Sequence, residues 1–347
     1  MATPWPPPPP PPVPPGPPAL PAYPYGGLSA VAQPPDPRGP RWSRRPHDQP
    51  VPYIHLLRTR HYRWWMSLLG ILLVVGLGLV SQLVTGIGVG LFLALGDKSF
   101  EQMLDAMTGT SPGAMLFANY VLATLIPITG IAVLVSHTER MEWLFSVVRR
   151  IRWGLLFGWA AFAVGLMAAS IVLGAVLPES AGGGMPASHP PPARELIALV
   201  VVLLLTTPLQ AAGEEFLFRG YLAQSIGAWI PSRLGALLVT APITALLFGL
   251  AHGAQDPWLF ADRFGFGIAA AVLVWLTGGL EVAIALHTVN NFAAYALALY
   301  SGTLAEAVTV SEAPVAPVIL DLVMLTIFTV AVWLWTRRHP VQRLSAG

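Results

Sequence analysis

The feature that most constrains this chain is a series of long apolar segments separated by short polar connections. A helix needs about 20 apolar residues to cross the hydrocarbon core of a bilayer. Eight segments meet this length, at about residues 64–95, 115–135, 155–177, 196–217, 235–255, 262–279, 281–300 and 317–336. Only 10% of the 347 residues are charged, which is far below the share in a soluble domain. The sequence therefore predicts an all-α polytopic membrane protein with about eight transmembrane helices, and it excludes an ordinary soluble enzyme.

A proline-rich segment precedes the apolar body. Residues 1–50 hold more than half of the 35 prolines in the chain. Such runs favour extended polyproline II and do not build a packed core. We therefore predict a disordered cytosolic tail over residues 1–55, an eight-helix transmembrane domain over 56–340 and a short cytosolic tail over 341–347. The N-terminal tail could also bind a proline-recognising partner or contact anionic lipid through its arginines.

The charges of the connections predict which ends of the spans face the cytosol. Arginines precede residue 64, occupy the connection 136–154 and follow residue 336, whereas the connections 96–114 and 301–316 are acidic. Cytosolic loops carry the excess of Lys and Arg in membrane proteins. Eight spans with both termini in the cytosol fit this alternation, whereas seven spans would place one basic terminus outside. We expect an integral protein of the plasma membrane.

Two glutamates and an arginine close the fourth apolar segment. An ionisable residue at membrane depth is costly and suggests function. Glu215 and Arg219 are four residues apart, so they share a helix face in the favourable acid-before-base order, and we expect an ion pair. Glu214 then has no local counter-charge. It is a candidate general base, although an interfacial carboxylate would fit the same position.

Two histidines and an asparagine lie in the following apolar segments. Taken alone, His252 would be a hydrogen-bonded core residue. However, Glu214 and His252 are equally far from the turn predicted at residues 231–233, so an antiparallel helical hairpin would place them side by side. His287 and Asn291 are four residues apart and share one helix face. They can donate hydrogen bonds to a developing negative charge, or form a polar clamp between helices.

These residue types support two chemistries. Glu214 and His252 could deprotonate a water while His287 and Asn291 bind the oxyanion, which is sufficient for amide hydrolysis. Glu214, His252 and His287 could instead bind zinc and leave one position open. The sequence has no Cys, no HExxH and no GxSxG, which excludes a cysteine nucleophile, the zincin pattern and a serine nucleophile elbow.

Three motifs follow one another on successive apolar segments. They are EExxxR (Glu214, Glu215, Arg219), FxxxH (Phe248, His252) and HxxxN (His287, Asn291). In this order they resemble the CPBP or ABI family, which includes type II CAAX prenyl endopeptidases and bacterial bacteriocin-processing and immunity proteins. The resemblance covers about residues 195–300.

The resemblance implies an eight-helix intramembrane endopeptidase. Glu214 and His252 would activate water, His287 and Asn291 would form the oxyanion hole, and Glu215, Arg219 and Phe248 would support them. We expect no cofactor, because Asn is a poor zinc ligand and a good oxyanion donor. A zinc ion on Glu214, His252 and His287 is the alternative.

Two further functions remain open. The chain could be a non-catalytic scaffold or immunity protein with the same fold. It could also be a transporter in which Glu214 and Asp321 relay protons, although the sequence shows no clear inverted repeat of broken helices. The expected partners are the lipid bilayer and a membrane-associated peptide or protein substrate, and no nucleic acid is expected.

Overall fold

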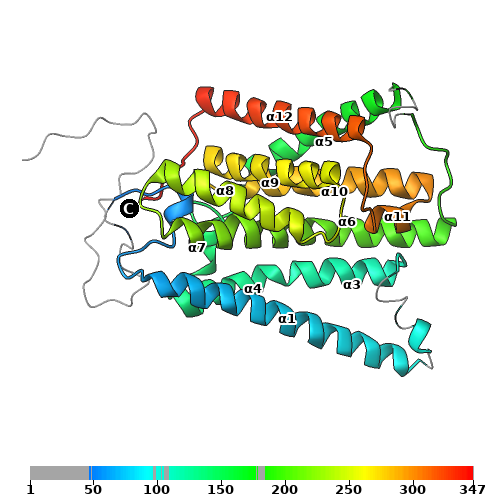
Figure 1. The fold of residues 1–347 in the computed structure, drawn as a ribbon, viewed down its shortest axis with the longest axis horizontal. Helices are drawn as coiled ribbons and strands as arrows, with labels where there is room; N and C mark the ends of the chain where they lie inside the picture. Colours follow the sequence, from blue (N-terminus) through cyan, green and yellow to red (C-terminus); the bar gives the residue numbers. More distant parts are fainter. Residues whose placement is uncertain are drawn as a thin grey trace, which may run out of the picture.

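The chain forms a bundle of long helices that run along the long dimension of the molecule (Figure 1). The computed structural model describes residues 47, 49–96, 99–102, 104, 109–176, 178 and 184–346. Eight helical spans in these ranges are long and apolar enough to cross a membrane. Their bounds are Trp64–Ala94, Pro112–His137, Trp153–Val176, Ala193–Gly227, Arg233–Leu250, Pro257–Thr277, Glu281–Ser301 and Val315–Arg338. The described ranges contain no β-strand, so the predicted all-α polytopic class is confirmed.

Six of the spans are single helices, and two are composite. The single helices are α1 (Trp64–Ala94), α5 (Trp153–Val176), α8 (Arg233–Leu250), α9 (Pro257–Thr277), α10 (Glu281–Ser301) and α12 (Val315–Arg338). The composite spans join α3 (Pro112–Ala123), α4 (Leu125–Ala132) and the π-helix η3 (Val133–His137), and α6 (Ala193–Glu215), the π-helix η6 (Phe216–Leu222) and α7 (Ala223–Gly227). The short elements are η2 (Tyr53–His55), η4 (Met141–Leu144) and α11 (Leu304–Val308).

The helix ends follow ordinary capping chemistry. The side chains of Ser111, Ser232 and Asp256 accept hydrogen bonds from backbone N–H groups in the first turns of α3, α8 and α9. At the opposite ends, α9 and α10 stop at Gly278 and Gly302, whose positive φ angles of 71° and 72° favour glycine. The polar connections therefore set the lengths of these spans.

The bundle is held together by close helix pairs. α3 packs on α6, α8 on α9, and α10 on both α5 and α6, while α12 covers α5 and α9. The approach of α3 to α6 requires Gly213, because a Cβ atom there would overlap the carbonyl oxygen of Leu122. Large apolar side chains on the outer faces, such as Leu72 and Leu83 of α1, remain exposed, as expected for surfaces that face lipid.

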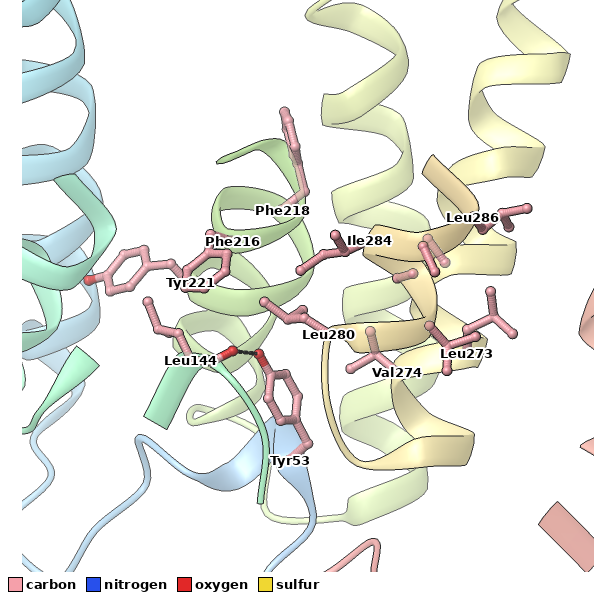
Figure 2. Close-up of a cluster of buried hydrophobic side chains, with 14 of the residues drawn as sticks. Tyr53, Leu144, Phe216, Phe218, Tyr221, Leu273, Val274, Leu280, Ile284 and Leu286 are labelled. Atoms are coloured by element: carbon pink, nitrogen blue, oxygen red, sulfur yellow. Dashed lines mark hydrogen bonds between the residues drawn. The ribbon is translucent and has the colours of Figure 1, made fainter. Parts of the chain in front are cut away.

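A compact apolar core joins the site-bearing helices to the segments at one end of the bundle. Figure 2 shows Phe216 and Tyr221 of η6, Leu280 and Ile284 at the start of α10, and Tyr53 of η2 in this core. Each of these side chains is buried. The core therefore fixes η6 against the first turn of α10, and these are the two elements that carry much of the candidate site.

The folded body extends beyond the predicted domain boundaries. Tyr53, Ile54 and His55 are buried, and the Tyr53 hydroxyl donates a hydrogen bond to the carbonyl oxygen of Leu144 (Figure 2). Because Tyr53 and Ile54 bury apolar surface, the last residues of the segment predicted as tail belong to the body instead. Residues 1–46 lie outside the described residues. The proline-recognising partner and the lipid contact predicted for this segment therefore stay predictions.

The C-terminal segment also packs on the body. Leu344 pairs with Pro52 in an isolated antiparallel bridge, and the backbone N–H of Ser345 donates to the carbonyl oxygen of Val51 at 2.9 Å. The segment predicted as a short cytosolic tail is therefore attached to the folded body through Leu344 and Ser345. Residues 50–54 and 342–345 together cover the end of the bundle at which α8 begins and α9 ends.

Candidate functional site

The site is built around a change of helix type. Glu214 and Glu215 are the last two residues of α6, and Arg219 lies in the π-helix that follows. π-helical turns within longer helices frequently occur at functional sites. Glu214 is 8% exposed and Glu215 is fully buried, so both carboxylates need partners inside the protein.

Glu215 and Arg219 form the predicted ion pair. Arg219 Nη1 donates to Glu215 Oε1 at 2.8 Å, and neither side chain is more than 1% exposed. The guanidinium also lies over the ring of Phe248, with its central carbon 4.5 Å from the ring centroid. This cation–π contact explains why Phe248 accompanies the charged residues.

His287 connects the two glutamates. Its Nδ1 lies 2.9 Å from Glu215 Oε1, and its Nε2 lies 3.2 Å from Glu214 Oε2. Carboxylate oxygens accept hydrogen bonds, so both contacts form together when each ring nitrogen carries a proton. The group of two carboxylates, one guanidinium and one imidazolium is then neutral. The sequence predicts His287 as an oxyanion donor, and the structure shows both of its nitrogens facing carboxylates.

Gln210 is a member of the site that sequence reasoning missed. Its Nε2 donates to Glu214 Oε2 at 2.8 Å, and its Oε1 accepts from Asn291 Nδ2 at 2.9 Å. Asn291 therefore reaches Glu214 through Gln210. The signal that could have found it is a polar side chain four residues before Glu214 on one helix face.

His252 lies just beyond the last residue of α8. Its Nδ1 donates to the carbonyl oxygen of Phe248 at 2.8 Å, so the neutral ring carries its lone pair on Nε2. The charge of Glu214 acts on His252, but the hydrogen bonds of the Glu214 carboxylate go to Gln210 and His287. The spacing argument thus brings the two residues into one region without a direct bond between them.

The predicted zinc ligands are not gathered around one point. Within the part of the chain that the structure describes, no three His, Asp or Glu side chains are grouped closely enough to hold a metal ion. Glu214 and His287 are adjacent, and the bond from Nδ1 of His252 to a backbone carbonyl leaves its Nε2 lone pair available, but the three side chains do not converge. In this arrangement the set does not fit a zinc ion.

A second buried ion pair fixes the start of α10. The guanidinium of Arg152 contacts both carboxylate oxygens of Glu281 at 2.7 Å, and Glu281 is fully buried. Glu281 is the first residue of α10, less than two turns before His287. The pair therefore helps to set the height of His287 beside α6. Sequence reasoning missed it, because the two residues are 129 positions apart.

Asp321 is not part of this group. It lies in α12, where its polar neighbours are Ser170 of α5 and Asp262 of α9. The charged groups that act on Glu214 are His287, His252 and Arg219 instead. The structure thus does not bring together the two carboxylates that a proton relay from Glu214 to Asp321 would need.

One comparison with known proteins gives a match at this site. Residues 196–293 match a family described as Rce1-like, type II CAAX prenyl endopeptidase Rce1-like. The comparisons with curated proteins and with solved structures gave no match. The matched range contains every residue of the three sequence motifs. With the eight apolar spans, the match makes the chain an integral membrane protein.

Proposed function

We propose that this chain, whose residues 196–293 match the Rce1-like family of type II CAAX prenyl endopeptidases, hydrolyses a peptide bond of a membrane-associated substrate. The observation that carries the proposal is the network of the buried Glu214, Glu215 and His287 with the half-buried Asn291, among helices that could cross a membrane. A structural ion pair would need only Glu215 and Arg219. The additional carboxylate, imidazole and amide are the groups that amide hydrolysis uses.

Glu214 is the proposed general base. Both of its described contacts fall on Oε2, and we assign the attacking water to Oε1. The carboxylate takes one proton from this water as the oxygen attacks the scissile carbonyl. Nε2 of His252 assists by accepting a hydrogen bond from the same water. The proton then passes to the leaving amine, which separates the two products.

Asn291 and His287 are the proposed oxyanion donors. Each already has an acceptor in the free protein: Gln210 Oε1 for Asn291, and the two glutamates for His287. The carbonyl oxygen of the substrate would therefore replace one of these acceptors as its negative charge develops. Such donors stabilise a transition state because they are oriented before the reaction begins.

Glu215, Arg219 and Phe248 are proposed as positioning residues. Glu215 holds Nδ1 of His287, Arg219 holds Glu215, and Phe248 lies beneath the guanidinium and carries the carbonyl that orients His252. Their removal would disturb the reaction through the groups that they hold. The charge of Glu214 also acts on the guanidinium of Arg219.

A metal-independent reaction is the proposed type. Asn291 supports it, because a carboxamide is a poor zinc ligand and a good oxyanion donor. Cleavage by protein freed of metal with a chelator should therefore continue at the original rate. Loss of cleavage that zinc restores would favour the zinc-dependent form on Glu214, His252 and His287.

The proposal is tested in cells with a membrane-tethered reporter and with Glu214→Ala and His252→Ala variants. Both variants should reach the membrane in normal amounts and leave the reporter uncut. Comparison of the membrane proteome between wild type and Glu214→Ala should then reveal at least one uncut substrate. Full cleavage by both variants would overturn the proposal, and a cellular phenotype that both variants retain would favour a non-catalytic scaffold or immunity protein.

We also propose that the protein lies in the plasma membrane with both termini in the cytosol. Basic residues at the start of α1 and the end of α12 support this orientation. A protease added outside intact cells should leave tags at both termini uncut, and it should remove them after the membrane is made permeable.

A further inference from the structure

A cavity of about 290 Å³ lies next to the candidate site and shares only one residue with it. Arg219 lines the cavity, whereas Glu214, Glu215, His252, His287 and Asn291 do not. The rest of the wall comes from residues 52–54, from α7, α8 and α9, and from residues 343–344. Its volume is close to the lower end of the range for small-molecule sites. The cavity is therefore a compartment distinct from the proposed catalytic groups.

The wall of the cavity is positively charged. Arg219, Arg233 and Arg343 line it, and no Asp or Glu is among the lining residues. Arg233 and Arg343 each donate to a backbone carbonyl oxygen, that of Pro50 and that of Thr336. Among the described residues, no carboxylate forms an ion pair with either guanidinium. A cavity with such walls favours an anionic occupant.

Arg219 has buried hydrogen-bond donors without a described partner. Its Nη1 is bonded to Glu215, but Nε and Nη2 are buried and have no hydrogen-bond partner among the described residues. The side chain is only 1% exposed. A buried donor without an acceptor is costly, and a guanidinium is best matched by the oxygens of a carboxylate or phosphate. The contact with Phe248 does not supply an oxygen acceptor.

Most of the remaining wall is apolar, with Thr240 as the exception. Leu237 of α8 and Ala271, Val274 and Trp275 of α9 line it. Figure 2 shows Val274 close to Tyr53, another lining residue. A small inorganic anion would leave this surface unfilled. The wall instead matches a molecule with an anionic head and a hydrocarbon chain.

The position of the cavity indicates that its occupant comes from the bilayer. Arg233 is the first residue of α8, and Trp275 lies in the last turn of α9, so the cavity is at the ends of two predicted spans. Helix ends lie near the lipid headgroups, where clustered arginines attract anionic lipids. The bilayer is therefore an immediate source of a molecule with both properties.

We propose that this cavity binds a single-chain anionic lipid, with its acidic head on the arginines and its chain along the apolar wall. The shared chemistry is an acyl chain that ends in a carboxylate or a phosphate. Because Arg219 lines the cavity and also holds Glu215, a bound head would lie one residue away from the proposed positioning groups. Binding is measured without any cleavage assay, so it is independent of the proposed protease activity.

The test uses fluorescence quenching of the purified full-length protein in an uncharged detergent. Dibrominated stearate is titrated in, because bromine quenches a neighbouring indole. The chain has 12 tryptophans, so the contribution of Trp275 is the difference between wild type and Trp275→Phe. Trp258→Phe, at the opposite end of α9, is the matched control. We expect saturable quenching in wild type and in Trp258→Phe, and its loss in Trp275→Phe.

Charge and space are then tested separately. Arg233→Gln combined with Arg343→Gln should raise the half-saturating concentration at least about tenfold, and Ala271→Phe should abolish saturable quenching by filling the cavity. Dibrominated lysophosphatidate shows whether phosphate or carboxylate is the preferred head. A dibrominated monoacylglycerol should bind at least about tenfold more weakly. Quenching in Trp275→Phe equal to that in wild type would overturn the proposal, and so would binding of the monoacylglycerol as tight as that of the anionic lipids. If Ala271→Phe does not fold, the variant with both arginines replaced decides the outcome.

Discussion

Replacement of Arg219 tests the physical basis of the site. Arg219 and Glu215 are 1% and 0% exposed, so solvent does not screen their interaction. Removal of one partner from a buried ion pair typically costs about 3–5 kcal/mol, because the remaining charge stays buried without compensation. Arg219→Met should destabilise the protein by this amount. At roughly 2–4 °C per kcal/mol, the apparent Tm should fall by about 6–20 °C.

A double variant separates the lost charge from the lost packing. In Glu215→Gln/Arg219→Met the amide oxygen can still accept from His287 Nδ1, and no unpaired charge is left. The double variant should therefore be more stable than Arg219→Met alone.

The assay is thermal unfolding in detergent at one fixed scan rate, since unfolding of such a protein is commonly irreversible. Arg140→Gln is the control, because its 3.5 Å contact with Glu142 is exposed and worth at most about 1 kcal/mol. If Arg219→Met unfolded at the same temperature as Arg140→Gln, or if the double variant were the least stable of all, the reasoning would be refuted.

Three further predictions concern packing, pH and the hydrogen-bond network. Gly213→Ala should strongly reduce the amount of folded protein, measured by size-exclusion chromatography, because its Cβ would overlap the backbone of Leu122, and a normal yield would show that α3 and α6 can separate. Burial raises the pKa of Glu139 to about 7 from its ordinary 4.5, so its contribution to stability is complete below pH 4.5 and is lost as the pH rises through about 7. The apparent Tm of Glu139→Gln should therefore decline less than that of wild type between these pH values, and parallel curves would contradict this assignment. Gln210→Ala should reduce the cleavage rate of a membrane-tethered reporter by about tenfold or more with little loss of stability, because Asn291 and Glu214 lose their link, and an unchanged rate would remove Gln210 from the site.

The fold was largely predictable because lipid imposes a simple requirement on the sequence. Runs of about 20 apolar residues are needed to cross the bilayer, and the eight runs in the sequence correspond to the eight spans of the structure. The ends of the folded body were less predictable. Tyr53 and Ile54 belong to it because their side chains are buried against η6 and α7. No local pattern in the sequence marks that contact.

The site was predictable where its contacts are local. The pair of Glu215 and Arg219 follows from helix spacing alone, and so does the shared face of His287 and Asn291. The two contacts of His287 with the glutamates were not predictable. They depend on the height of α10 relative to α6, which packing and the distant ion pair between Arg152 and Glu281 help to determine.

The most direct test of the central claim compares two variants that make the same chemical change. Glu214→Gln keeps the shape of the proposed base and removes its charge, whereas Glu139→Gln makes this change in a connection away from the site. We predict that purified Glu214→Gln cleaves a membrane-tethered reporter at least about 100-fold more slowly than wild type, with Glu139→Gln close to the wild-type rate. A Glu214→Gln rate within about tenfold of wild type would contradict the claim that Glu214 is the general base.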